Sequence, residues 1–495
     1  MPDRGRASQP WILAATILGS SLVFIDGTVV SIALPVLQET FHASAAAAQW
    51  VVESYTLVLG ALTLLSGALG DRYGRRLLFI SGVVVFAIGS LLCGLTTSMT
   101  GLILARILQG LGGTMLAPAS LALIGASFVG KDRGMAIGTW SGLTSVASAI
   151  GPVAGGAIVD HFGWRWAFFI NLPIALAVVL IALRHVTESR DEGERGRPDI
   201  VGSLLVTCGL AGVVYAFVAS GQSGWDGATI AAACAGALAL AAFVLFERIA
   251  HDPILPLALF KRRDFTGINV MTLLIYSALS GLFYFLPFVI IQVDGYSATV
   301  AGAAMLPFIV LMVLLSRVSG MLAYRMGPRT VLVIGPLVTA CGFALFGMFR
   351  ELHYWNAIFP SVTVIGLGMG LTVAPLTATL LESVPEQHVG LASGVNNATS
   401  RVAGLLAIAI FGALLSGVFY ADLNSRSASL SVAQRREVIA QRSQLAAAQH
   451  RDPAETAVVH QSYISGFRAV AFASAGVTAL AAVVALLTLP KKQRA

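Results

Sequence analysis

Charged residues are scarce in this sequence. Only 11% of its 495 residues are Asp, Glu, Lys or Arg, whereas 57% are hydrophobic. A soluble domain carries about 25% charged residues, so this composition cannot cover a water-exposed surface and excludes a soluble globular protein. The formal net charge of +7 does not indicate a nucleic-acid partner, because basic residues gather on the cytoplasmic side of membrane proteins.

The sequence also lacks the residue patterns that are typical of metal sites, of enzymes embedded in the membrane and of ATP binding. The four cysteines fall inside apolar runs without metal-ligand spacing, and none of the eight histidines lies in the middle of such a run. The stretch GASFVGKD (125–132) is similar to a phosphate-binding loop, but Asp132 replaces the required Ser or Thr and no strand precedes it. We therefore expect no enzyme activity, no metal site and no cofactor, and an ion gradient as the energy source.

What the sequence does contain is a series of apolar runs, each long enough to cross a hydrocarbon core of ~30 Å as a helix. Fourteen candidate spans lie at 11–38, 47–70, 76–97, 101–128, 134–159, 164–184, 200–220, 228–248, 265–292, 298–322, 329–349, 355–380, 389–419 and 465–489. With the N-terminus inside, most basic residues fall in short cytoplasmic segments, as the positive-inside rule requires. The pattern predicts a multi-pass protein of a bacterial-type inner membrane with both termini cytoplasmic.

An internal repeat predicts the architecture. The paired stretches are QGLGGTMLAP (109–118) with GLGMGLTVAP (366–375), GMAIG (134–138) with GLASG (390–394), and GALGDRYGRRLLF (67–79) with GMLAYRMGPRTVL (320–332). Their offsets of 257, 256 and 253 residues are nearly equal and keep the same order. Chance similarity between Gly/Ala/Leu-rich segments is the alternative.

The repeat predicts two six-helix bundles, at 1–185 and 265–495, with linkers and two inserted helices at 186–264. The second bundle includes a long extracytoplasmic loop at 420–464, which is expected to be partly helical. Many secondary transporters consist of two such halves, with the substrate-binding site between them near the membrane midplane.

Six motifs, in order along nearly the whole chain, resemble the major facilitator superfamily and, within it, the 14-spanner drug:proton antiporters. They are FIDGTVVSIALP (24–35), GALGDRYGRR (67–76), LARILQGLGG (104–113), GPVAGG (151–156), WRWAFFINLP (164–173) and GLASGVNNATSRVAG (390–404). The resemblance implies an all-α major facilitator fold with 14 transmembrane helices. It also implies a proton-coupled exporter of amphipathic, cationic drugs or toxic compounds that works by alternating access.

The second motif predicts a conformational latch. Its residues are Gly67, Asp71, Arg72, Gly74, Arg75 and Arg76. The glycines allow helices or a tight turn to pass closely, and the charges at the helix exit can join helix ends in one state only. The resemblance implies that this latch stabilises the outward-open state, whereas a plain topology signal is the alternative.

The fourth motif predicts a specialised helix. Gly151 and Pro152 are expected to break the helical hydrogen-bond ladder, Gly151 and Gly155 offer a close-packing face, and Gly156 completes the motif. The resemblance implies a bendable helix that seals the cavity during export. Packing alone explains the same residues almost as well.

Two acidic residues, Asp26 and Glu53, lie well inside apolar spans. An Asp at the centre of a span costs about 2.5–3.5 kcal/mol on insertion scales, so a functional reason is expected. Their depths, together with that of Arg106, predict a coupled proton site facing the outer half of one cavity. A helix-packing hydrogen bond for Asp26, a structural role for Glu53 and a purely structural pairing for Arg106 are the alternatives.

A substrate cavity is expected to involve residues of the spans at 265–292 and 389–419. The candidates are Tyr276, Phe283, Tyr284, Asn396, Asn397 and Arg401. A lipid-facing or core position for the aromatic residues, and a structural role for Arg401, remain alternatives.

The expected partners are small amphipathic substrates, protons and membrane lipids, with no nucleic acid, and the expected state is a monomer. Other functions stay open: a dedicated exporter of one lipid or secondary metabolite, a proton-coupled importer, or a membrane protein without transport activity.

Overall fold

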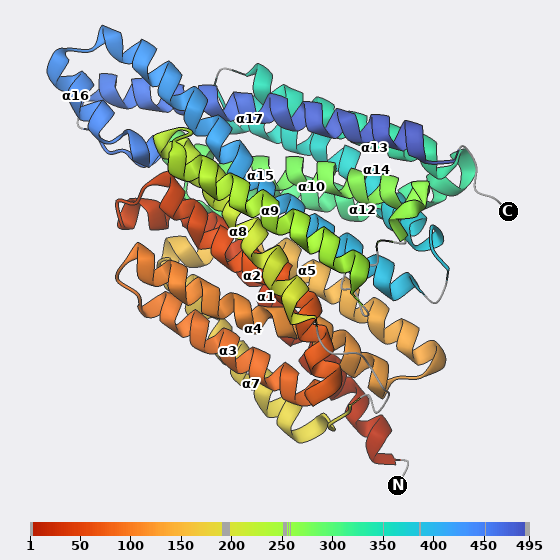
Figure 1. Ribbon diagram of the computed structural model, residues 1–495. Helices are drawn as coiled ribbons and strands as arrows, with labels where there is room; N and C mark the ends of the chain where they lie inside the picture. The colour runs from red at the N-terminus through yellow and green to blue at the C-terminus, as the bar shows by residue number, and fades with distance from the viewer. Residues whose placement is uncertain are drawn as a thin grey trace.

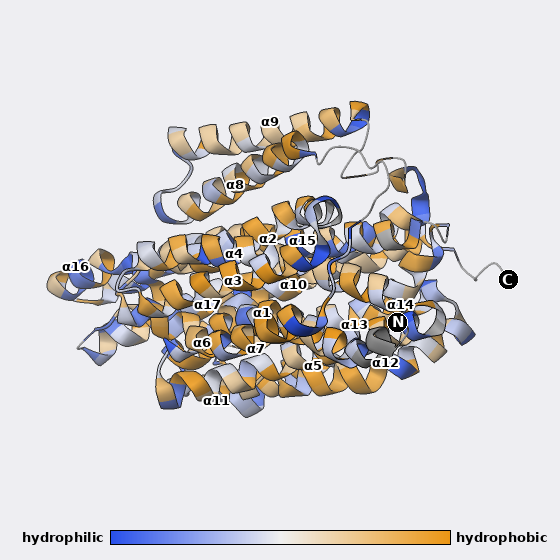
Figure 2. Cartoon of the chain, turned by 90° about the horizontal axis from the view of Figure 1, so that it is seen from below, coloured by the Kyte–Doolittle hydropathy of each residue, from blue (hydrophilic) through white to orange (hydrophobic). Residues whose placement is uncertain are grey.

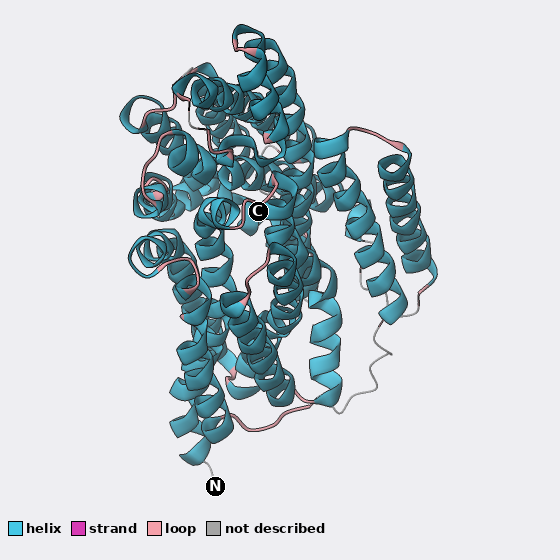
Figure 3. Ribbon diagram, turned by 90° about the vertical axis from the view of Figure 1, so that its left-hand side faces the viewer, coloured by secondary structure: helices cyan, strands magenta, loops and turns pink. Residues whose placement is uncertain are grey.

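The protein is helical throughout the part of the chain that the structure, a computed structural model, describes: residues 3–190, 199–250, 255, 257, 259–349, 351–385, 388–450 and 452–490 (Figure 3). Fourteen helical stretches within these ranges are long and apolar enough to cross a membrane, as the sequence predicts. Helices suit this environment because each satisfies its backbone hydrogen bonds within its own segment.

The first half of the chain forms six spans. Its helices are α1 (Asp3–Thr40), α2 (Ala45–Tyr73), α3 (Arg75–Leu95), α4 (Met99–Ser127), α5 (Gly130–Phe162), and α6 (Trp166–Phe169) with α7 (Asn171–His185). Polar residues begin several of them: Ser44 and Ser98 each accept a hydrogen bond from the backbone N–H three residues further on, which satisfies one of the free donors at a helix start.

The second half repeats this arrangement after an inserted pair, α8 (Ile200–Ser223) and α9 (Gly227–Ile249). Its helices are α10 (Arg263–Phe288) continued by η2 (Val289–Val293), α11 (Ala298–Ala303), α12 (Leu306–Met326), α13 (Pro328–Met348), η3 (Tyr354–Ile358), α14 (Phe359–Glu382), α15 (Val389–Arg426), α16 (Val432–Ala440) and α17 (Pro453–Thr488). Short 3₁₀ turns lie at η1 (Leu259–Lys261), η5 (Ser427–Ser429) and η6 (Arg442–Ala447).

Close glycine contacts reproduce the sequence repeat in three dimensions. Gly82 of α3 packs on Gly112 of α4, and Gly335 of α13 packs on Gly368 of α14, with no room for a Cβ at Gly112 or Gly368. The members of the two pairs differ by 253 and 256 positions (335 − 82 and 368 − 112). The same helix pair is thus built twice with the same small-residue contact.

The inserted pair lies at the side of the molecule (Figure 2). Helix α8 packs against α2 of the first bundle and α15 of the second, and α9 packs on α8. The apolar contact is formed by Leu57, Leu210, Val214, Val218, Leu405 and Ala409. Because α8 touches both bundles, it covers the seam between them on this side.

The two ends of the bundles differ. The start of α1 and the end of α17 lie at one end, here the terminal end, and α16 lies at the opposite end, here the α16 end (Figure 1). Hydrogen bonds between the bundles gather at the α16 end: Gln292 Nε2 donates to the Pro35 carbonyl (3.1 Å) and to Gln38 Oε1 (3.3 Å). Gln38 Nε2 in turn donates to the Gln444 carbonyl (2.9 Å). The passage between the bundles is therefore closed at the α16 end.

The structure refines three expectations from the sequence. The segment 420–464, expected to be a partly helical loop, contains the end of α15 at Arg426, all of α16, and the start of α17 at Pro453. Helix α5 continues from Gly130 to Phe162 through Pro152. Pro152 has no N–H and so removes one hydrogen bond of the ladder, but it does not end the helix. Helix α2 continues to Tyr73, beyond the predicted edge at 70. Helices that extend past the apolar window carry polar turns that hydropathy alone assigns to loops.

Candidate functional site

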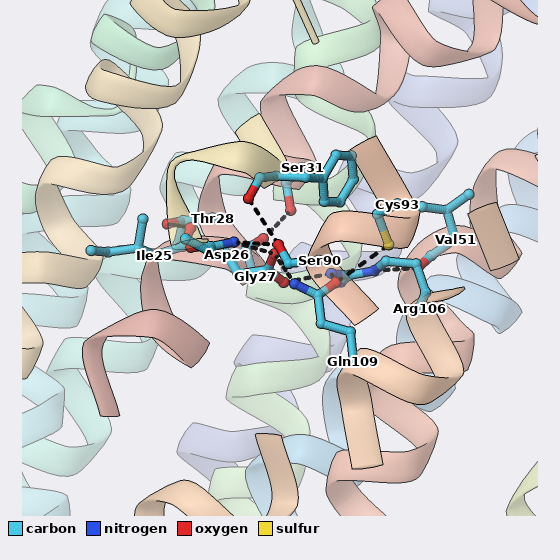
Figure 4. Close-up of polar contacts among 12 residues, drawn as sticks. Ile25, Asp26, Gly27, Thr28, Ser31, Val51, Ser90, Cys93, Arg106 and Gln109 are labelled. Carbon is cyan, nitrogen blue, oxygen red and sulfur yellow. Dashed lines mark hydrogen bonds and ion pairs between the residues drawn. The ribbon is translucent and has the colours of Figure 1, made fainter. Parts of the chain in front are cut away.

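The central polar feature is an ion pair between α1 and α4 (Figure 4). Arg106 Nη1 lies 2.5 Å from Asp26 Oδ2, and both side chains are almost fully buried, with 1% and 0% exposure. Gln109, one turn beyond Arg106, accepts from Arg106 Nη1 (2.8 Å) and donates to Asp26 Oδ1 (2.8 Å). The three side chains form a closed hydrogen-bonded ring.

Further groups complete the surroundings of this ring. Asn171 Nδ2 donates to Asp26 Oδ1 (3.4 Å) and to Ser90 Oγ (3.0 Å). Arg106 Nε donates to the Val51 carbonyl (3.1 Å), and its guanidinium lies 3.9 Å from the centre of the Tyr55 ring. A buried ion pair is tolerated only when its remaining donors and acceptors are satisfied, and here α1, α2, α3, α4 and α7 together supply the partners.

Sequence reasoning missed Gln109, Asn171 and Tyr55. Gln109 and Asn171 lie inside LARILQGLGG and WRWAFFINLP, the motifs that carry the family resemblance. A polar side chain one turn after a buried Arg was the available signal for Gln109. Nothing in the sequence indicates that Tyr55 stacks on Arg106.

Glu53 does not join this ring in any described contact. Its side chain is fully buried in α2, and neither carboxylate oxygen has a hydrogen-bond partner among the described residues. Tyr284 of α10 lies near Glu53, and its hydroxyl also lacks a hydrogen-bond partner in the described part of the chain. The structure thus divides the predicted three-residue site into an Asp26–Arg106 pair and a separate Glu53.

A cavity of about 540 Å³ lies between the two bundles. Its wall is formed by Phe24, Thr28, Ser31, Ile32, Val52, Thr144, Ser145, Ser148, Ala149, Pro152, Tyr276, Leu279, Ser280, Phe283, Tyr284, Pro287, Met305, Phe308, Ile309, Met312 and Ile408. None of the described side chains on this wall is charged. The wall combines aromatic rings from both bundles with a row of hydroxyl groups on α5.

The predicted charged residues do not face this cavity, contrary to the expectation from their depths. Thr28 lines the wall, whereas Asp26, two residues earlier, points into the first bundle. Two residues rotate a helix by about 200° at 3.6 residues per turn, so the two side chains lie on opposite faces of α1. Depth along a helix predicts the level of a residue but not its direction.

Three of the six predicted cavity residues line the wall: Tyr276, Phe283 and Tyr284. Asn396 instead donates hydrogen bonds to Asn269 Oδ1 (3.2 Å) and Thr272 Oγ1 (2.7 Å) in α10.

The other two predicted residues also lie off this wall. Asn397 is exposed, and Arg401 lies where α15 passes Gly60 of α2. The hydroxyl row of α5, Thr144, Ser145 and Ser148, was not predicted.

The glycines of the fourth motif join α5 to two neighbouring helices. A Cβ on Gly151 would overlap Thr28 Oγ1 of α1, and one on Gly155 would lie 2.9 Å from the Val29 Cα. A Cβ on Gly156 would overlap the Ala298 carbonyl of α11, in the second bundle. Gly151 and Gly155 thus allow α5 to pack closely on α1 within the first bundle, whereas Gly156 permits backbone contact with α11 across the interface between the bundles.

Asp160 strengthens the same interface one turn further along α5. Its carboxylate accepts from the backbone N–H groups of Ala298 (3.0 Å) and Thr299 (2.7 Å) and from Thr299 Oγ1 (2.5 Å). A carboxylate at a helix start is favourable because it satisfies free N–H groups. Helices α5 and α11 therefore close the α16 end together.

The second motif forms the turn between α2 and α3. Gly74 has φ of 125°, a conformation that favours glycine, and the equivalent Gly327, 253 residues later, has φ of 85° between α12 and α13. Gly67 makes only an ordinary contact, 3.7 Å from a Cβ to Pro118. The motif therefore requires glycine at position 74, where the turn has a positive φ, rather than at position 67.

Glu188, which sequence reasoning did not single out, binds this turn from the segment after α7. Its carboxylate accepts from the N–H groups of Arg76 (3.0 Å) and Leu77 (3.0 Å) at the start of α3. Arg76 Nη2 donates to the Leu183 carbonyl of α7 (2.8 Å), and the Arg75 N–H donates to the Ser189 carbonyl (3.0 Å).

These contacts hold the motif within the first bundle. Arg72 lies over the Tyr73 ring at 5.7 Å. The Asp71 side chain lies outside the described part of the structure, so its place in the latch stays a prediction.

Comparison with known proteins identifies the family. The sequence model of the Major Facilitator Superfamily matches residues 16–408. The chain belongs to the major facilitator superfamily. It is 34% identical to the tetracenomycin C resistance and export protein of Streptomyces glaucescens, over 98% of this chain and 93% of that protein.

Other members of the superfamily are also similar. The multidrug resistance protein Stp of Mycobacterium tuberculosis is 32% identical, over 84% of this chain and 78% of that protein. The crystal structure of a bacterial homolog to the human lysosomal transporter Spinster, inward-facing and unoccupied, superposes with a TM-score of 0.66 at 15% identity, over 97% of this chain and 98% of that one. The fold is therefore the major facilitator fold with 14 helices, in a multi-pass membrane protein.

Proposed function

We propose that this chain exports amphipathic, cationic compounds across the inner membrane in exchange for protons. The cavity between the bundles is the observation that carries the proposal. Its volume of about 540 Å³ lies within the range of small-molecule sites, about 300–1,000 Å³. The named relatives, an exporter of tetracenomycin C and a multidrug resistance protein, support an organic cargo.

The wall of the cavity suits a cation with a large apolar surface. Phe24, Tyr276, Phe283, Tyr284 and Phe308 present aromatic rings, and a cation over such a ring gains about 0.5–2 kcal/mol. The described wall offers no charged partner that would restrict binding to one ligand geometry. Binding therefore depends on the shape of the cavity and on contacts with aromatic rings, which favours a broad range of substrates over a single compound.

Glu53 is proposed to carry the proton. An ionised carboxylate without a donor or a countercharge is strongly disfavoured in a dry interior, so in this state Glu53 is accommodated as the neutral acid. Tyr284 lies near Glu53 and also lines the cavity. A cation arriving beside Tyr284 would favour the carboxylate and thereby release the proton.

Asp26 and Arg106 are proposed to support this exchange. Their charges compensate one another in the closed ring with Gln109. The pair holds α1 and α4 in register beside α2, which carries Glu53. Arg106 also reaches α2 directly through the Val51 carbonyl, so a change at Asp26 is transmitted to the helix of Glu53.

Alternating access is proposed to begin from the conformation described. The terminal end is assigned to the cytoplasm, so the closed α16 end faces outward and the cavity is loaded from inside. One proton crossing 100 mV supplies about 2.3 kcal/mol, and one pH unit adds about 1.4. For a neutral cargo the sum sustains a gradient of several hundredfold per proton. A monovalent cation that leaves against the same potential cancels the electrical part, so one proton then sustains about a tenfold gradient per pH unit.

The test uses inverted membrane vesicles from cells without other exporters, with a lipophilic cationic dye as substrate. Energised vesicles containing the wild-type chain should accumulate the dye, and a protonophore should abolish accumulation. Glu53→Gln, which cannot release a proton, should lose gradient-driven uptake but keep dye-for-dye exchange. Equal uptake with and without the proton gradient would refute proton coupling.

A dedicated exporter of one compound is the second candidate, because the relative from Streptomyces glaucescens is named for a single compound. A panel of structurally unrelated cationic and neutral compounds distinguishes the two candidates. Uptake of several unrelated cations supports the first, whereas uptake of one compound only supports the second.

A further inference from the structure

The segment between α15 and α17 folds into a small helical cap at the α16 end. Helix α16 begins with a reciprocal capping arrangement between Ser431 and Gln434. The Gln434 Nε2 group also donates to Asp452 Oδ2 (2.5 Å), and Asp452 accepts from the Ala454 N–H (2.8 Å) at the start of α17. This contact fixes α16 against the first turn of α17.

The same contact brings two further acidic residues together. Glu437 follows Gln434 by three residues on α16, and Glu455 follows Asp452 by three residues on α17, so each lies on the same helix face as its predecessor. His450 lies between them. One ligand atom from each of Glu437, His450 and Glu455 lies within 4.8 Å of the others, and His450 Nδ1 is 3.4 Å from Glu455 Oε2.

The buried histidine is the feature that calls for an explanation. The His450 side chain is 0% exposed and that of Glu455 is 4% exposed. Neither ring nitrogen of His450 has a hydrogen-bond partner among the described residues. Buried polar groups in proteins are rarely left without a partner, and this one is aimed at two carboxylates.

We propose that Glu437, His450 and Glu455 form a binding site for a divalent transition-metal ion of the zinc type. One imidazole and two carboxylates are ligands that Zn²⁺ accepts, and two carboxylates balance its charge. Tetrahedral zinc with ligand bonds of 2.0–2.2 Å places its ligands about 3.4 Å apart. The separation of His450 and Glu455 already has this value, and Glu437 is the exposed member through which the ion and a water ligand enter.

The ion would join α16 to the start of α17 and hold the cap in place. This assignment differs from the expectation of no metal site, which the sequence supported because the three residues span two helices and a connecting segment without a recognised spacing. The site shares no residue with the proposed proton exchange at Glu53, so metal binding can be tested separately from transport.

The experiment uses the purified full-length chain in detergent after removal of metals with a chelator. Titration with Zn²⁺ by calorimetry should show one equivalent bound, and Co²⁺ should develop the visible absorption of a tetrahedral site. Glu437→Gln and His450→Gln should each weaken Zn²⁺ binding at least tenfold. Bound Zn²⁺ should also slow tryptic cleavage at Arg435 and Arg436.

The matched control is His353→Gln. His353 lies 3.5 Å from Glu351, but both side chains are open to solvent, at 61% and 80% exposure, so this pair should not contribute to binding. The Glu437 side chain lies on an exposed helix face, so we expect its substitution to leave the fold intact. No saturable Zn²⁺ binding, or binding that is unchanged in either Glu437→Gln or His450→Gln, overturns the proposal.

Discussion

Removal of the Asp26 charge should destabilise the protein strongly, whatever its effect on transport. Asp26→Asn leaves the Arg106 guanidinium buried at 1% exposure without its countercharge. The remaining partners are the Val51 carbonyl, Gln109 Oε1 and the Tyr55 ring. Breaking a buried ion pair on one side costs about 3–5 kcal/mol, which is roughly two to three and a half orders of magnitude in the folding equilibrium.

The double variant Asp26→Asn, Arg106→Gln should recover much of this loss. It removes both charges, and its two amides can still donate to and accept from Gln109. Neutral replacement of a buried ion pair is often close to neutral in stability. The coupling energy from the four-member cycle should therefore exceed about 2 kcal/mol.

Thermal unfolding of the purified variants, followed by tryptophan fluorescence, measures the effect. The single variant should unfold at least several degrees below the wild type, since about 1 kcal/mol shifts Tm by roughly 2–4 °C in mid-sized domains. Asp226→Asn is the matched control, because Asp226 is the exposed N-cap of α9 and Asn caps a helix equally well. If Asp26→Asn is as stable as this control, or the double variant is no more stable than the single one, the ion pair does not have the assigned structural role.

Three further predictions concern the closed α16 end and the turn after α2. Gly156→Ala should shift the population toward opening at the α16 end by about 1–3 kcal/mol, because its Cβ overlaps the Ala298 carbonyl. Spin-label distances between α5 and α11 measure this shift, and Gly142→Ala, whose Cβ meets nothing within 4 Å, should leave them unchanged. Asp160→Ala should shift those distances in the same direction, because α11 loses the carboxylate that accepts its first N–H groups; unchanged distances would show that the glycine contacts alone hold the closure. Glu188→Gln should lower stability by about 0.3–1 kcal/mol in low salt and less in high salt, and a salt-independent loss of Tm would contradict the assigned interaction with the start of α3.

Much of the fold follows from the sequence because the relevant signals are local. The number of spans depends on the length and hydropathy of each run, and the structure contains the predicted fourteen. The repeat offsets predicted which helices correspond, and the glycine contacts of α3 with α4 and of α13 with α14 agree with them. Helix ends were less well predicted, as at Pro453, because amphipathic turns beyond the apolar core resemble loops in composition.

The candidate site could be predicted less completely from the sequence than the fold. Asp26 and Arg106 were predicted to lie near one another, and they form an ion pair. The direction of each side chain was not predictable, since a helix rotates about 100° per residue and the sequence does not state which face meets which neighbour. This is why Thr28 faces the cavity while Asp26 does not, and why Asn396 serves helix packing.

The sequence by itself determined that this is a membrane protein of fourteen helices in two related halves, with a few charges in places where charge is costly. Hydropathy and residue type are properties of the chain alone, so these conclusions need no coordinates. Only the tertiary structure decided that Gln109 completes the Asp26–Arg106 pair, that Glu53 stands apart from it, and that Glu437, His450 and Glu455 meet. Such meetings depend on helix rotation and on contacts between segments far apart in the chain, which no local pattern encodes.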